Sequence, residues 1–257
     1  MNFTGQGRPL NAEGMGNACS ALGVAAPVVW AVLTVETRGF GFLQDRRPRI
    51  LFERHIFHRL TNGRHDAGNE DISNGKPGGY VGGPAEYTRL GKALELDREA
   101  ALQSASWGIG QVMGFNFKVA GFATIDVMIE AMVRDENAQL LAMANFAKGN
   151  NLAGALQRQD WAAFARGYNG ADFRKNEYDS RLAAAHARYE GTLPDLALRA
   201  AQAALLYLGV DPGPVDGFQG QQTHAALRQF QQRLGLPGTG ELDPDTATRL
   251  FAEAFPP

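Results

Sequence analysis

The segment PVDGFQGQQT, residues 214–223, decides how the C-terminal part of this chain folds, because a version of it returns a short distance later. The second version is GELDPDT, residues 240–246. The two superpose in one register that pairs Gly217 with Gly240, Thr223 with Thr246 and Leu227 with Leu250. Repetition of a turn followed by a short apolar helix indicates a small packed module built from similar units.

The residues of each unit have physical reasons to form a turn and then a helix. Glycine adopts the backbone conformations that a tight turn needs. In the second unit Asp243 is a good N-cap, and Pro244 fits the first helical position because its missing N–H is not needed there. Ahead of both units, residues 198–208 place leucine and alanine at helical spacing before Gly209. The C-terminal residues therefore predict three short helices.

Together these motifs resemble the three-helix peptidoglycan-binding module found on bacterial and phage wall enzymes. The likeness covers residues 195–257 and rests on Leu-Gly, Pro-Val-Asp-Gly-Phe, Gly-x-x-Thr, Phe-Gln, Gly-Leu and Pro-x-Thr in that order. Gln221 stands where the family usually has proline and Asp243 where it usually has glycine, and both fit a helix start. The resemblance implies that the module attaches the protein to peptidoglycan, with Asp216 and Phe218 among the wall-binding residues.

Length and composition limit the remaining possibilities. The 257 residues leave room for about two domains, and 44% hydrophobic with 20% charged residues is ordinary for a globular protein. A formal net charge of -2 argues against a general nucleic-acid binder. The single cysteine, Cys19, excludes an intramolecular disulfide and fits synthesis in a reducing cytoplasm. The first residues lack a signal-peptide pattern, and the longest apolar stretch, Val28–Val35, is too short to span a membrane.

The N-terminal part is predicted to be mainly helical. Asn11 caps a first helix that ends near Gly23, and the next helix, Val28–Val35, is apolar on nearly every face and therefore buried. Residues 50–60 form a helix or a strand followed by a helix, and residues 61–84, rich in Gly, Asn and Asp, form a long loop or irregular hairpin. Further helices are expected over residues 85–103, 125–148, 151–168 and 178–189, before a linker at Gly191 and Pro194.

Glu36 follows the buried apolar helix directly. A carboxylate at the C-terminal end of such a buried helix loses hydration, which favours its neutral form and raises its pKa. A proton held near neutral pH is what the leaving oxygen of a glycosidic bond requires. A glutamate in this position is more often just the exposed end of the helix, so the position alone makes Glu36 a candidate general acid.

Further motifs occur in an order typical of lysozyme-like enzymes. Glu36–Gly39 (ETRG), Ser106–Met113 (SWGIGQVM) and Ala165–Gly170 (ARGYNG) resemble the acid, glutamine and tyrosine-asparagine segments of soluble lytic transglycosylases and goose-type lysozymes. With Pro48–His55 (PRILFERH), Gly78–Tyr80 and Ser104–Gly108, they resemble the phage N-acetylmuramidase endolysin family over residues 15–190. The resemblance implies a lysozyme-like helical catalytic domain.

The same resemblance implies a role for each matching residue. Glu36 is expected to be the general acid. Gln111, Tyr168 and Asn169 are expected to hold the sugar and its N-acetyl group, and Ser106 to line the same turn. The stretch between Glu36 and Gln111 is longer than in compact relatives, and it leaves the second carboxylate open.

Hydrolysis needs a group that orients water or stabilises the cation, and glycosidases use a second carboxylate for this. The carboxylates of the insert are Asp45, Glu53, Asp66, Glu70 and Asp71. Asp45 and Glu53 lie nearest Glu36 in sequence and are the two candidates, although Glu53 is equally a structural partner for a neighbouring arginine. If neither serves, the sugar's own hydroxyl attacks, and the enzyme is a lytic transglycosylase that leaves 1,6-anhydromuramic products.

Three readings from other classes compete with a glycosidase. His55, His58 and His65 with Asp66 could bind zinc in an amidase or peptidase, but the spacing required for a zinc metalloprotease helix is absent. Cys19 could serve a thiol peptidase, but its spacing from neighbouring apolar residues indicates a core position. A purely adhesive protein leaves the ordered motifs unexplained.

The sequence therefore predicts a mainly α fold with two domains, residues 1–190 for catalysis and residues 195–257 for wall binding. The expected enzyme hydrolyses the bond between N-acetylmuramic acid and N-acetylglucosamine in peptidoglycan, with no metal or other cofactor. We expect a monomer that binds no nucleic acid and does not insert into membranes. As a phage endolysin, it is expected to be made in the infected cytoplasm and to reach the periplasmic wall after membrane permeabilisation.

Overall fold

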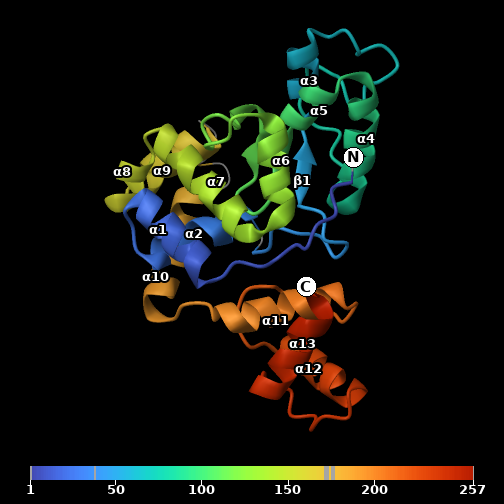
Figure 1. Cartoon of the computed structure of the whole chain (residues 1–257). Coiled ribbons are helices and arrows are strands. Elements are labelled where there is room, and N and C mark those ends of the chain that lie inside the picture. Colours follow the sequence, from blue (N-terminus) through green and yellow to red (C-terminus); the bar gives the residue numbers. More distant parts are fainter. Residues whose placement is uncertain (1, 38, 171–173, 175–176, 257) are drawn as a thin grey trace.

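The computed structural model describes residues 2–37, 39–170, 174 and 177–256, and the side chains of Glu36, Thr37 and Asn169 lie outside the described part. Two lobes lie one above the other in Figure 1. The helices of the larger lobe are α1 (Ala12–Leu22), α2 (Ala26–Thr37), α3 (Arg54–Thr61), α4 (Glu86–Leu96), α5 (Arg98–Gln103), α6 (Ile125–Arg134), α7 (Glu136–Gly149), α8 (Ala153–Gln157), α9 (Trp161–Asn169) and α10 (Tyr178–Gly191), with 3-10 turns at Gly83–Ala85 and Gly114–Asn116. The smaller lobe consists of α11 (Leu196–Tyr207), α12 (Gln221–Arg233) and α13 (Pro244–Ala254).

The first two helices form as their sequences predict. The Asn11 side chain accepts a hydrogen bond from the Gly14 N–H, and Gly23 ends α1 with a φ of 67°. α2 lies in the core, packed along α10, and the hydroxyls of Thr34 and Tyr189 lie 2.6 Å apart. In the part of the chain that is described, no single helix is long and apolar enough to cross a membrane, although α1 and α2 pass that test together as a pair bent by 98°.

Three of the expected long helices are each broken into two by an aspartate. Asp97, Asp135 and Asp160 accept the backbone N–H of Ala100, Ala138 and Ala163, and so become the N-caps of α5, α7 and α9. A short carboxylate competes for backbone N–H groups and favours a helix start over a helix interior. The apolar spacing continues across each break, which explains why it predicted one helix where the structure has two.

A small antiparallel sheet carries the segments that the sequence singled out. Its strands are β1 (Ile50–Phe52), β2 (Ala105–Trp107) and β3 (Val112–Met113), in the order β1-β2-β3, with Leu51 opposite Ser106 and Ser106 opposite Met113. One face points into the core with Ile50, Phe52, Ala105, Trp107 and Val112. The other face carries Leu51, Ser106 and Met113, of which Leu51 and Met113 are only partly buried.

The two sequence units of the smaller lobe have the same internal construction. In the first, the Oε1 atom of buried Gln202 accepts the Gly217 N–H at 2.8 Å, and its Nε2 lies 3.1 Å from Thr223 Oγ1. In the second, buried Gln231 makes the matching contacts with the Gly240 N–H at 2.8 Å and Thr246 Oγ1 at 3.1 Å. The glutamines therefore explain why both glycine and threonine recur. The sequence analysis noted Gln231 in the Phe-Gln motif, but it missed Gln202 and the matching roles of the two glutamines.

The lobes have separate apolar cores that a third cluster joins. The larger core runs from Phe3 to Tyr189, and the smaller one from Leu198 to Ala254. Phe40 and Phe42 of the larger lobe pack with Ala203 and Val215 of the smaller one. The segment just after α2 is therefore in contact with the smaller lobe.

Candidate active site

The less buried face of the sheet gathers the side chains expected to act on substrate. Leu51, Ser106 and Met113 share this face because they are directly paired across the strands. Glu53 follows Leu51 by two residues in extended backbone (φ -101°, ψ 94°), so its side chain points to the same face. Its N–H bonds to the Ser104 carbonyl at 2.9 Å. Glu53 and Ser106 therefore lie on the same face of the sheet.

Gln111 is held rigidly in the turn between β2 and β3. Its Oε1 accepts the Ser106 hydroxyl at 2.8 Å, and its Nε2 donates to the carbonyls of Gly108 at 2.8 Å and Arg49 at 3.3 Å. The φ of Gln111 is 46°, in the left-handed region that residues other than glycine rarely adopt. Such backbone strain is concentrated at functional sites, which agrees with a substrate-binding role for this turn.

Tyr168 braces the same turn from α9. Its hydroxyl donates to the Gly110 carbonyl at 2.8 Å. Its ring stacks on Phe164 with centroids 5.2 Å apart and meets the edge of Phe146 at 5.6 Å. The structure therefore brings three expected residues, Ser106, Gln111 and Tyr168, into one hydrogen-bonded unit. Asn169 follows Tyr168 at the end of α9, but its side chain is outside the described residues.

Glu36 lies in the last turn of α2, and its side chain is likewise outside the described residues. The backbone after it leads directly to the site. Gly41 accepts the Arg49 N–H at 2.8 Å, and the Arg49 carbonyl accepts the Gly108 N–H at 2.9 Å. Gly41, four residues beyond α2, is thereby connected to the Gln111 turn through two backbone hydrogen bonds.

Glu53 has two close neighbours, Tyr80 and His55. The Tyr80 hydroxyl donates to its Oε2 at 2.8 Å, and His55 Nδ1 lies 3.2 Å from the same oxygen without hydrogen-bond geometry. Partial burial, together with the hydrogen bond to Glu53 and the charge of Glu53, raises the pKa of Tyr80 to about 12. Glu86 holds the Tyr80 segment by accepting the Val81 N–H at 2.7 Å. The long insert therefore brings a tyrosine to Glu53.

Asp45 has a different environment. It pairs with Arg47 at 2.6 Å, and the Arg47 guanidinium lies 4.2 Å from the centre of the Tyr87 ring. Partial burial acts to raise the pKa of Asp45, but the hydrogen bonds and charge of Arg47 outweigh it and lower the pKa. Its carboxylate is thus occupied by an ion pair on the loop before β1, whereas Glu53 lies on the site face of the sheet.

The histidines of the zinc hypothesis have separate partners. His58 bonds through Nδ1 to Asp66 at 2.8 Å, His55 lies beside Glu53, and His65 stacks on Phe57 at 5.9 Å. Among the residues that the structure describes, no group of three or more His, Cys, Asp or Glu side chains could hold a metal ion. The geometry gives the zinc alternative no support.

Two polar residues of α7, Glu136 and Gln139, support the site and escaped the sequence analysis. Gln139 is 1% exposed, accepts the Ile109 N–H at 2.7 Å and donates to the Met132 carbonyl at 2.7 Å. Glu136 is fully buried and accepts the Gly41 N–H at 2.8 Å. A polar residue at a core position of an apolar-periodic helix was the available signal, because such residues are buried only when hydrogen-bonded.

Asp216 and Phe218, expected to bind the wall, are partly engaged within the protein. Asp216 Oδ1 accepts the Phe218 N–H at 3.0 Å. The Phe218 ring stacks on Tyr189 with centroids 6.4 Å apart, and the Arg188 guanidinium lies 4.6 Å from its centre. Both side chains are half-buried, so wall binding by them stays a prediction.

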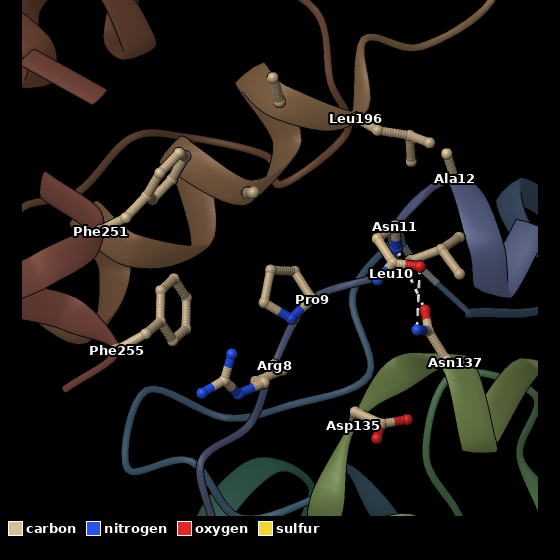
Figure 2. Close-up of a pocket in the computed structure, with 12 residues that line it drawn as sticks. Arg8, Pro9, Leu10, Asn11, Ala12, Asp135, Asn137, Leu196, Phe251 and Phe255 are labelled. Carbon is tan, nitrogen blue, oxygen red and sulfur yellow. Dashed lines mark hydrogen bonds between the residues drawn. The ribbon is translucent and has the colours of Figure 1, made fainter. Parts of the chain in front are cut away.

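A cavity of about 490 Å³ lies between the lobes and is separate from this site. Figure 2 shows Phe251 of α13 and Phe255, just after this helix, on one side, with Arg8–Ala12 and the hydrogen-bonded pair Asn11 and Asn137 on the other. The cavity contains none of the expected site residues. It lies where the N-terminal segment and α7 of the larger lobe meet α11 and the end of α13.

Comparisons with known proteins match two parts of the chain to two different families. The N-acetylmuramidase family matches residues 25–190, and a peptidoglycan binding domain family matches residues 195–250. The crystal structure of the Burkholderia AP3 phage endolysin is similar at 39% sequence identity and a TM-score of 0.67, over 71% of each chain. A comparison with curated proteins finds no match.

Proposed function

Because the chain belongs to the N-acetylmuramidase family and is a glycoside hydrolase that acts on peptidoglycan, we propose that its catalytic centre lies between the end of α2 and the site face of the sheet. The observation that carries this proposal is the single hydrogen-bonded unit of Ser106, Gln111 and Tyr168, with Glu53 on the same face. In this proposal Glu36 is the general acid. Gln111, Tyr168 and Asn169 position the sugar, and Ser106 fixes Gln111.

The reaction follows from these positions. Glu36 donates a proton to the leaving oxygen while the sugar ring takes on positive charge. The second carboxylate is Glu53 and not Asp45, because Glu53 shares the face of the sheet with Ser106 whereas Asp45 is paired with Arg47. With Tyr80 donating to one oxygen, the other oxygen of Glu53 can accept a proton from water or face the developing cation. The expected outcome is hydrolysis and a reducing N-acetylmuramic acid end.

Matched substitutions test the assignment on soluble glycan strands. Glu36→Gln keeps the side-chain volume but removes the transferable proton, so kcat should fall by about 100-fold or more. Glu53→Gln should also lower kcat strongly, whereas Asp45→Asn should leave it near the wild-type value. Circular dichroism controls for folding. A folded, active Glu36→Gln protein would overturn the site, and mass spectrometry showing mainly anhydro products would overturn hydrolysis.

We also propose the role of each part of the chain. Residues 1–190 form the catalytic domain and residues 195–257 the domain that binds peptidoglycan, with Asp216 and Phe218 contacting the wall through their exposed atoms. The similarity to a phage endolysin supports a role in host lysis, in which a protein made in the infected cytoplasm reaches the periplasmic wall after membrane permeabilisation. It acts as a monomer, independently of nucleic acid and without inserting into membranes. Light scattering of the purified protein tests the monomer, and Phe218→Ala tests wall contact in a sacculus pull-down.

A further inference from the structure

Arg199 connects the lobes through a fully buried ion pair. It lies near the start of α11, and both its side chain and that of Glu136 on α7 are 0% exposed. Arg199 Nη1 donates to Glu136 Oε2 at 2.5 Å, and Nη2 donates to Glu136 Oε1 at 2.8 Å. The rings of Trp30 and Phe40 lie beside the guanidinium, with centroids 5.8 and 5.5 Å from Cζ. Arginine suits this environment because its planar group donates in two directions and packs on aromatic rings.

The same pair holds the backbone that follows Glu36. Nη2 of Arg199 also donates to the Gly39 carbonyl at 2.6 Å. Glu136 Oε1 accepts the Gly41 N–H at 2.8 Å, and its Oε2 accepts the Leu10 N–H at 2.8 Å. Gly39 has a φ of 93°, so its conformation is one that favours glycine. Two of the three residues 39–41 are thus fixed by one ion pair.

The β2–β3 turn that carries Gln111 is hydrogen-bonded to α7, one helical turn after Glu136. Gln139 follows Glu136 by one turn of α7 and accepts the Ile109 N–H at 2.7 Å. A Cβ atom on Gly41 would lie 2.0 Å from Gln139 Oε1, and one on Gly108 would lie 2.5 Å from Gln139 Cδ. The backbone after Glu36 and the Gln111 turn therefore meet on the first turns of α7, without room for larger residues.

We propose that Arg199, a residue of the wall-binding module, is a positioning residue for the glycosidase reaction. It fixes the segment 39–41 and, through Glu136, sets where the end of α2 stands relative to the Gln111 turn. The inference rests on the proposed role of Glu36. It makes the module part of the catalytic structure, whereas a simple tether would act only by raising the local concentration of enzyme at the wall.

The test uses the full-length protein and soluble, peptide-free glycan strands, so that attachment to the wall does not contribute. Arg199→Lys retains a cation for Glu136, but a single ammonium cannot replace both guanidinium arms. We expect kcat to fall by roughly 10- to 100-fold, because small misplacements of catalytic groups cost that much, while KM changes by less than about twofold. In Arg199→Ala, guanidinium chloride should restore part of kcat, and an equal concentration of sodium chloride should not.

Tyr207→Phe is the matched control. It removes another contact between the lobes, the hydrogen bond from the Tyr207 hydroxyl to the Gly7 carbonyl at 2.7 Å, and keeps the ring that packs on Phe40 with centroids 6.0 Å apart. It should keep the wild-type kcat. A folded Arg199→Lys protein with wild-type kcat, alongside an inactive Glu36→Gln protein, would refute the positioning role and leave the proposed function intact. An active Glu36→Gln protein would refute the proposed function itself. If the Arg199 variants do not fold, Glu136→Gln tests the same link, and a wild-type kcat there also refutes it.

Discussion

The two units of the smaller lobe are alike inside and different outside. Gly217 and Thr223 surround Gln202 in the first unit just as Gly240 and Thr246 surround Gln231 in the second. Even the carbonyls match, since Gln202 Nε2 bonds to that of Phe218 at 3.0 Å and Gln231 Nε2 to that of Glu241 at 2.9 Å. One solution for folding a turn onto a helix is therefore used twice.

The two units differ at two positions that the superposition of their sequences pairs. Val215 of the first unit corresponds to Gly238 of the second, and Phe218 corresponds to Glu241. Val215 is 6% exposed and packs with Phe40 and Phe42, and Phe218 stacks on Tyr189. The first unit is thus a joint to the catalytic lobe through Val215 and Phe218. The second unit has neither side chain at the matching positions, and α13 meets that lobe near its end, where Arg46 donates to the Ala254 carbonyl. Repeated sequence predicts shared construction, and the positions where the repeat fails predict the interface.

Removing the whole module should have the largest effect and tests whether the first unit is a joint or only a tether. Without Arg199, Glu136 loses its cation, and breaking a buried ion pair by removing one partner destabilises proteins by about 3–5 kcal/mol. Residues 1–190 alone should therefore unfold at lower temperature and cleave soluble glycans poorly. Calorimetry and reducing-sugar release check both effects. Full activity of the fragment on soluble strands would show that the module is only a tether.

Substituting the two glutamines separates the units. Gln202→Leu leaves the N–H groups of Asp216 and Gly217 without their acceptor, at a cost of about 3 kcal/mol, and loosens the joint. Gln231→Leu should cost a similar amount in the second unit. Only Gln202→Leu should lower kcat on soluble glycans, whereas both should weaken binding to sacculi. Equal loss of kcat in both variants would contradict the different roles of the units.

Exchanging single residues between the units is a milder test. Val215→Gly installs the residue of the second unit in the joint and should cost about 2 kcal/mol, since a buried valine side chain is lost. Gly238→Ala is the control, because its Cβ would lie 3.3 Å from the flexible Gln232 side chain and should be tolerated. Urea unfolding measures both. If the two variants were equally stable, the Val215 side chain would not stabilise the contact between the lobes.

Much of this fold was predictable because local residues determine it. The cap at Asn11, the buried helix before Glu36, the strand-helix junction at Ile50–Phe52 and the three C-terminal helices all follow from nearby sequence. The predictions failed at Asp97, Asp135 and Asp160, where one carboxylate overrides the apolar spacing on both sides. The family and the wall-binding module were identified from the same local motifs and are confirmed.

The site was predictable only in part. Ser106, Gln111 and Tyr168 were expected to act together. Ser106 is hydrogen-bonded to Gln111, and Tyr168 to the carbonyl of the preceding Gly110, although their roles stay predictions. The connection of Glu136 to Arg199 was not foreseen, because 63 positions separate two residues that no local pattern relates. Hydrogen bonds across such separations depend on how whole helices pack, which a motif does not encode.

The helix starts of the two units offer the smallest test. Asp243 caps α13 by accepting the N–H groups of Asp245 and Thr246, whereas the corresponding cap of α12 is Gly220, which has no side chain to accept. Gly220 has open space around it, so Gly220→Asp should stabilise the protein by on the order of a few tenths of a kcal/mol.

The backbone N–H and hydroxyl of Thr246 hold the pKa of Asp243 below its ordinary value. A depressed pKa contributes stability above the unfolded value of about 3.9, and this contribution is lost as the pH falls through the folded pKa. Asp243→Asn should therefore be less stable than wild type at pH 7 and approach it as the pH drops below about 3.9. A stability difference that does not change with pH would show that the Asp243 charge makes no contribution to the cap.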